Sequence, residues 1–145
     1  MNIEKNIRTF IGDENSQGTG RYSSFDYCYN YFQLFKDSNS ISNIASRNNL
    51  QISCLQLGFY LASWGMLRGS SFLLQKSAKF YEQLIRNIAN FDQRIWDIDV
   101  NTYNNMDNIK LIMKCAEMIE ISLGRNNRPS DTLITKIMLG VFGCV

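Results

Sequence analysis

The chain has 145 residues, of which 45% are hydrophobic and 19% are charged, with a net charge of +2, one proline, four cysteines and no histidine. A chain of this length is expected to form one domain that buries about two-thirds of its unfolded surface, so disorder is not expected. Without histidine these residues cannot provide Ser-His or Cys-His nucleophile pairs, an HExxH metal site or an imidazole general base. Most classes of small hydrolase are therefore excluded for this stretch of sequence.

The basic residues are dispersed between Lys5 and Lys136 and form no cluster of four or more. This distribution is not the basic footprint of a strong DNA-binding protein. The N-terminal sequence lacks the apolar segment of a signal peptide, and no apolar run approaches the ~20 residues that span a bilayer. We therefore predict a cytoplasmic protein with no membrane span.

The four cysteines lie at positions 28, 54, 115 and 144, so none of them forms a CxxC pair. A structural zinc site would have to recruit all four thiolates from distant segments, because no histidine is present. We predict reduced cysteines buried as small apolar side chains, and we predict neither a metal nor a cofactor.

Near the N-terminus, residues 2–11 fit a short helix, and the polar, glycine-containing residues 12–20 predict a flexible loop. The next segment places apolar side chains at helical spacing after a serine N-cap, which predicts a helix over residues 23–35. Its tyrosines also alternate, at Tyr27, Tyr29 and Tyr31, as they would in a strand. We favour the helix.

Residues 50–67 are apolar nearly all round a helix, which predicts a buried central helix. One stripe contains Leu50, Cys54, Leu57, Leu61 and Trp64, and a second contains Ile52, Leu55, Phe59 and Met66. Small residues at Gly58, Ala62, Gly65 and Gly69 would share one face, where either another backbone packs closely or a ligand enters.

The remaining segments predict further helices and no sheet. Residues 71–91 predict a long amphipathic helix, whose inward positions are Leu73, Ser77, Phe80, Leu84, Ile88 and Phe91, joined by Leu74, Ala78, Tyr81 and Ile85. Alternation at Trp96, Ile98 and Val100 suggests a strand, but a lone strand has no sheet to join, so we favour an irregular connector. A helix over residues 106–123 should end at Gly124 and turn Ile109, Ile112, Met113, Ala116, Ile119 and Leu123 inward.

Ser130 is a suitable N-cap for a last helix over residues 131–145. The sum is an all-α domain, an irregular bundle of five to six helices around the central helix. The sequence stops inside the apolar run Gly-Val-Phe-Gly-Cys-Val, whereas natural C-termini are usually polar. Either this end docks against the core or a partner, or the chain is the N-terminal part of a longer protein, which is the alternative we favour.

Two segments carry a resemblance to known proteins. The stretches YLASWGMLRGSSFLLQKS (60–77) and TLITKIMLGVFGCV (132–145) resemble the most recognisable segments of an uncharacterised prokaryotic family. In that family the second segment continues with Pro-Ala and an aromatic-Asp pair, which this chain lacks. The resemblance implies a bacterial or phage origin and a truncated chain, and it implies no activity.

The strongest candidate for ligand chemistry is the run Arg68-Gly69-Ser70-Ser71 at the start of the predicted 71–91 helix. A helix N-terminus offers free N–H groups, the serine hydroxyls add donors, and an arginine can bind phosphate or carboxylate with two parallel hydrogen bonds. Arg68, Ser70 and Ser71 therefore form a candidate anion site. The alternative is ordinary helix capping, with Arg68 paired to an acidic residue or to carbonyl groups, and the GxxxxGK[ST] pattern of a P-loop is absent.

Three weaker patterns have ordinary structural explanations. Asp92, Asp97 and Asp99 form the only carboxylate cluster that could hold a divalent cation, and a solvated connector is the simpler explanation. The rings between Tyr22 and Phe35, with Arg21 and Lys36 at either end, could stack nucleic-acid bases, although packing explains about half of them. Residues 125–128, RNNR, predict a solvated basic turn.

From these patterns we expect a non-enzymatic helical interaction protein or complex subunit of prokaryotic or phage origin. It would bind a protein partner, or another copy of itself, through an apolar and tyrosine-bearing surface. The candidate partner-binding residues are Tyr27, Tyr31, Val141, Phe142 and Val145. The alternative is a nucleotide- or nucleic-acid-phosphate-binding protein or enzyme that uses Arg68, Ser70 and Ser71; no catalytic residue can be assigned.

Overall fold

The helical periodicities of the sequence are realised as helices in a computed structural model, which describes residues 3–11, 20 and 22–144. Within these residues there is no strand, so the predicted all-α class is confirmed, and the 91–105 segment is an irregular connector with two short 3-10 helices. The α-helices are α1 (Ile3–Ile11), α2 (Ser23–Asp37), α3 (Leu50–Ser63), α4 (Glu82–Asn90), α5 (Met106–Leu123) and α6 (Asp131–Phe142).

The ends of α5 and α6 follow from local capping chemistry. The Asn105 side chain accepts a hydrogen bond from the Asp107 backbone N–H, and Gly124 ends α5 with a φ of 84° that favours glycine. Ser130 Oγ accepts from the Leu133 backbone N–H at 3.2 Å, as its predicted role as N-cap requires. The predicted bounds of the 106–123 helix and the predicted start of the last helix are confirmed.

The prediction of one long helix over residues 71–91 is wrong. The segment forms two short 3-10 helices, η3 (Phe72–Gln75) and η4 (Ala78–Tyr81), before α4 begins at Glu82. Lys76 and Ser77 between them have extended backbone. Leu73 and Tyr81, on either side of this break, are both buried.

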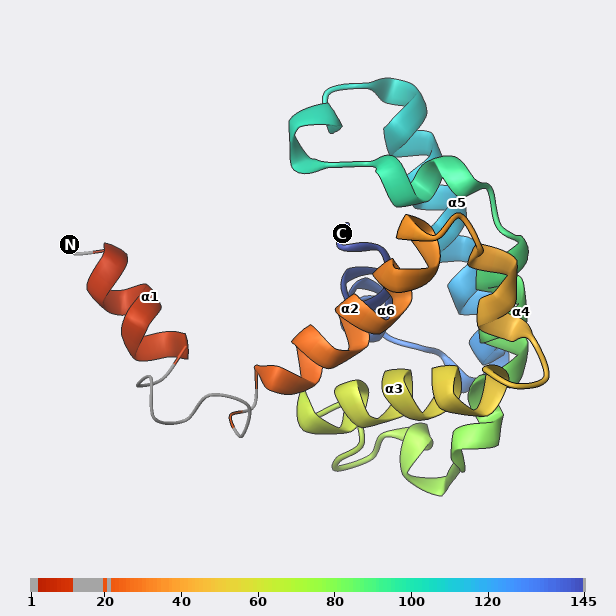
Figure 1. Ribbon diagram of the computed structural model, residues 1–145. Helices are drawn as coiled ribbons and strands as arrows, with labels where there is room; N and C mark the ends of the chain where they lie inside the picture. The colour runs from red at the N-terminus through yellow and green to blue at the C-terminus, as the bar shows by residue number, and fades with distance from the viewer. Residues whose placement is uncertain (1–2, 12–19, 21, 145) are drawn as a thin grey trace.

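Helix α3 lies at the centre of the contacts, because it packs against α2, α4, α6 and η4 (Figure 1). Its central place is as predicted, but it is not buried all round, because Ile52, Leu55 and Phe59 are exposed. The predicted small-residue face does not form either. The helix ends at Ser63, and Gly65 and Gly69 lie beyond it with positive φ angles.

The C-terminal helix α6 docks into the core instead of presenting its apolar side chains outward. Val141, Phe142 and Cys144 are buried, and the Gln33 side chain donates a hydrogen bond to the Val141 carbonyl at 3.1 Å. Figure 1 shows this end of the chain passing behind α2. The described part of this segment therefore packs against the core of its own chain.

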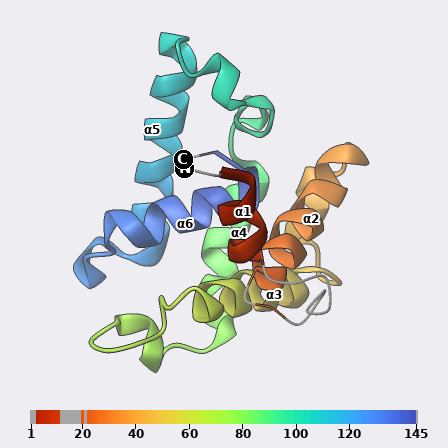
Figure 2. The ribbon, with the colours of Figure 1, turned by 90° about the vertical axis from the view of Figure 1, so that its left-hand side faces the viewer.

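Helix α1 has a different environment from the other helices. Figure 1 shows it lying apart from them, and the view in Figure 2 brings it in front of α6 only in projection. Ile3 and Ile7 on this helix are exposed. The predicted flexible loop at 12–20 lies outside the described residues except for Gly20.

The four cysteines are all free and buried, as predicted. Burial raises the pKa of the Cys28 and Cys115 thiols to about 12 and that of Cys54 and Cys144 to about 11. A neutral buried thiol is a poor nucleophile, so the cysteines act as apolar core side chains. None of the helices in the described part of the chain is long and apolar enough to cross a membrane.

Candidate functional site

The candidate anion residues lie in a turn between α3 and η3. Since no long helix begins at Ser71, the predicted helix N-terminus is absent, and the Ser71 side chain caps only the four-residue η3 by accepting from the Leu73 N–H. Arg68 and Ser70 are exposed in this turn. The dipole argument for anion binding at this position is therefore wrong, and any binding must come from side chains.

Folding brings a second basic residue to this turn. A pocket of about 410 Å³ lies between the turn and the segment that leads into α6. Arg68, Ser70 and Ser71 line it from one side, and Arg128 and Ser130 line it from the other. From the sequence Arg128 is expected in a solvated turn, and its place in the same pocket as Arg68 could not be predicted, because nothing local in the sequence relates the two segments.

The two pocket arginines, Arg68 and Arg128, differ in their ion pairing from Arg125, which lies in the same turn as Arg128. Arg125 pairs with Glu117 at 3.0 Å, whereas Arg68 and Arg128 make no ion pair among the described residues. Arg128 has the left-handed backbone conformation, with a φ of 48°, which is uncommon for a residue with a side chain. The pocket therefore holds two cationic groups and no lining carboxylate.

The candidate partner-binding residues are not assembled on one surface. Val141 and Phe142 are in the core, where the Phe142 ring lies 4.7 Å from Trp96, so their assignment to an exposed surface is wrong. Tyr31 is partly buried and its hydroxyl lies 2.8 Å from Ser53 Oγ. Burial raises the pKa of Tyr31, as expected for an internal hydroxyl. Tyr27 is exposed, and Val145 lies outside the described residues.

Exposed apolar surface occurs instead on α3. Ile52, Leu55 and Phe59 are 46%, 50% and 63% exposed, and their spacing of three and four residues places them on one side of the helix. We call these three residues the α3 stripe. The α3 sequence, LQISCLQLGFYLAS, contains no charged residue, so the stripe has no charged border on its own helix. A second exposed series, Met106, Ile109 and Met113, lies on α5 and has Lys110 and Glu117 on the same helix.

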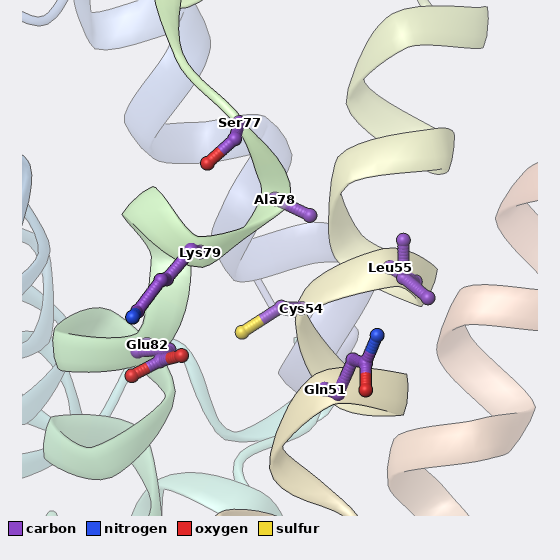
Figure 3. A pocket seen from close by; sticks show the side chains of 7 residues that line it. All are labelled: Gln51, Cys54, Leu55, Ser77, Ala78, Lys79 and Glu82. Carbon is purple, nitrogen blue, oxygen red and sulfur yellow. The ribbon is translucent and has the colours of Figure 1, made fainter.

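A pocket of about 360 Å³ lies beside the α3 stripe, between α3 and the η4–α4 segment. Figure 3 shows the Cys54 sulfur directed from α3 toward the segment that carries Lys79 and Glu82, with Leu55 on another side of the helix. The Cys54 thiol has a pKa raised to about 11 by burial, so it is neutral near pH 7. The pocket holds no activated nucleophile.

The three aspartates of the 92–99 segment have separate structural partners. Asp92 binds the Arg94 guanidinium at 2.6 Å, Asp97 pairs with Lys36 at 3.2 Å, and the Asp99 side chain caps the next 3-10 helix. Across the described residues, no group of three metal-ligating side chains is placed to hold an ion. The simpler explanation, a connector stabilised by its own carboxylates, accounts for them.

Asp92 provides a test of this connector. Hydrogen bonds from the Arg94 side chain and backbone lower its pKa to about 2 from the usual 3.8. The interaction therefore contributes to stability above about pH 4 and is lost as the pH falls through 2. In an NMR titration of the carboxyl carbon, Arg94→Ala should raise the pKa of Asp92 but leave it below 3.8, since the backbone N–H of residue 94 remains. An unchanged pKa in this variant would contradict the pairing.

The aromatic series of α2 is used mainly for internal packing. Phe32 is buried, while Phe25 and Phe35 pack against the core. Lys36 donates to the Trp96 carbonyl at 2.6 Å, and Arg21 lies outside the described residues. These side chains therefore do not present the row of open ring faces that stacked bases require.

Comparison of the chain with protein-family models, with curated proteins and with solved structures finds no match in any of the three. The resemblance of residues 60–77 and 132–145 to a prokaryotic family therefore stays a prediction. The fold of the described residues identifies the chain as an all-α protein. Only its own surfaces and pockets bear on its function.

Proposed function

We propose that this protein is a non-enzymatic helical interaction protein, or a subunit of a complex, that binds a protein partner through the α3 stripe. The single observation that supports the proposal is the exposure of Ile52, Leu55 and Phe59 on a helix whose opposite side is buried. An amphipathic helix of a partner protein commonly binds by packing its apolar face against an apolar surface of this kind.

The absence of charge on α3 defines the chemistry of the partner. A partner with a charged face would lose hydration against this uncharged helix and gain no ion pair from it. We therefore expect a partner helix with an apolar face in a cellular protein different from this chain. Leu55 also lines the pocket beside the stripe, which gives a partner side chain a place to insert.

The experiment compares the wild-type protein with Leu55→Glu and with Val100→Glu. Val100 is a matched control, because it is also an exposed apolar residue but lies in the connector before α5. Each tagged protein is purified from its native cells, and the mass and stoichiometry of the eluted complex are measured by light scattering. We expect a stoichiometric complex that is retained in Val100→Glu and at least about tenfold weaker in Leu55→Glu.

Three results would contradict the proposal. The first is a monodisperse monomer without a stoichiometric partner. The second is a complex that survives Leu55→Glu unchanged, and the third is a homodimer that depends on Leu55, which would assign the stripe to self-association. Circular dichroism of each variant shows whether the helices are intact.

A further inference from the structure

We infer that the pocket between the 65–72 turn and the start of α6 binds a small phosphate-bearing molecule. Arg68 and Arg128 come from segments far apart in the sequence and line the same pocket of about 410 Å³. This volume lies within the range of ordinary small-molecule sites. The inference concerns a different surface from the α3 stripe, so neither proposal depends on the other.

The charge of the pocket is not neutralised within the described part of the chain. Three other arginines, Arg8, Arg94 and Arg125, each have a carboxylate oxygen within 3.0 Å, whereas Arg68 and Arg128 have none that close. Asp131, in the first turn of α6, is the nearest acidic residue in sequence and does not line the pocket. Two arginines that line one pocket with no lining carboxylate favour an anionic ligand.

The serines add donors of the right type. Ser71 and Ser130 use their oxygen atoms to accept backbone N–H groups, which leaves each hydroxyl hydrogen free to donate to a ligand. Ser70 lines the same pocket. The N-terminus of η3 contributes no useful dipole, because η3 has only four residues. Guanidinium and hydroxyl donors together suit the several acceptor oxygens of a phosphate group.

The rest of the lining indicates what the phosphate carries. Met66, Phe72 and Leu133 also line the pocket, so an apolar wall lies beside the two arginines. A ligand with a phosphate group and a flat or apolar part fits both features, as a nucleoside monophosphate does. A long nucleic acid fits less well, because only Arg68 and Arg128 among the described residues that line the pocket are basic.

The test is an NMR titration of the arginine Nε–Hε signals with inorganic phosphate and, separately, with AMP. We expect saturable shifts at Arg68 and Arg128, with AMP binding more tightly than phosphate because its ring has the apolar wall to contact. Arg68→Ala and Arg128→Ala should each weaken AMP binding by at least about tenfold. Arg125→Ala, which removes a charge from the same turn but outside the pocket, should change it by less than about twofold.

Other outcomes would overturn the inference. Absence of a saturable shift up to about 10 mM AMP would exclude a site of useful affinity. An equal loss of affinity in Arg125→Ala and Arg68→Ala would indicate general surface charge instead of a pocket. Tighter binding of a short single-stranded oligonucleotide than of AMP would assign the arginines to nucleic acid. Because both pocket arginines are exposed, we expect the variants to keep the wild-type amide spectrum away from the pocket.

Discussion

Replacing Phe142 with alanine is expected to lower the free energy of unfolding by about 3–5 kcal/mol, the usual cost of removing a buried aromatic side chain. Phe142 is only 3% exposed, and its ring packs edge-on against Trp96 with 4.7 Å between centroids. Both the apolar contacts and the ring pair are lost in the variant, and the cavity lies where α6 meets the 93–97 segment. Urea unfolding followed by circular dichroism measures the change.

Phe59→Ala is the matched control for this experiment. The Phe59 side chain is 63% exposed on α3, so the same truncation should change the free energy of unfolding by less than about 0.5 kcal/mol. A similar loss in both variants would contradict the assignment of one ring to the core and the other to the surface. If Phe142→Ala leaves the free energy of unfolding unchanged, Phe142 is not a core residue and is again a candidate for binding a partner.

The parts of the fold that depend on neighbours in sequence could be predicted. Ser130 and Gly124 are residues whose side chain or backbone freedom suits a helix end, and the structure uses both in that way. The α2 segment is ambiguous between helix and strand, and its apolar spacing favours the correct alternative. The predicted serine N-cap is wrong, because Tyr22 is the N-cap and makes no side-chain capping hydrogen bond. Local chemistry therefore located most helices, and it located the boundaries of α5 closely.

The face that each helix buries was harder to predict. On α5 the spacing of apolar residues predicts that Ile109 and Met113 face inward, but both are exposed. The buried series is Leu111, Cys115, Ile119 and Leu123, which has an equally regular spacing of four residues. On α3 the two apolar stripes indicated burial all round. Periodicity shows that a segment is helical, but which of two apolar faces is covered depends on the other helices of the fold.

The pocket arginines and the break after Gln75 show a second limit. Arg128 lines the same pocket as Arg68 because α6 lies beside the turn after α3, where Lys136 donates to the Trp64 carbonyl at 2.7 Å. At Lys76 and Ser77 extended backbone interrupts a segment whose apolar spacing is helical, and Leu73 and Tyr81 on either side of it are in the core. Both features are set by tertiary packing, so no window of sequence contains the signal.

Gly140→Ala is expected to destabilise the protein by about 1–3 kcal/mol, although alanine normally stabilises a helix interior by about 1 kcal/mol relative to glycine. A Cβ at position 140 would lie 2.5 Å from Cε1 and 2.8 Å from Cδ1 of Tyr60, and the Tyr60 ring is buried on α3. Since neither the ring nor the helix backbone has space to move freely, α6 and α3 must separate. Because the local and tertiary effects have opposite signs, the direction of the change reveals which effect is larger.

A second variant separates a steric clash from other causes. Tyr60→Leu alone creates space and lowers stability, but in its background the same Gly140→Ala change should be neutral or stabilising, because the ring no longer opposes the new Cβ. Gly58→Ala is the graded comparison: its Cβ would lie 3.2 Å from the Tyr81 ring, so a smaller effect is expected there. If Gly140→Ala stabilises the protein with Tyr60 present, then α6 does not approach α3 as closely as the structure places it. A loss of equal size in both backgrounds would mean that a cause other than the Tyr60 ring opposes the new methyl group.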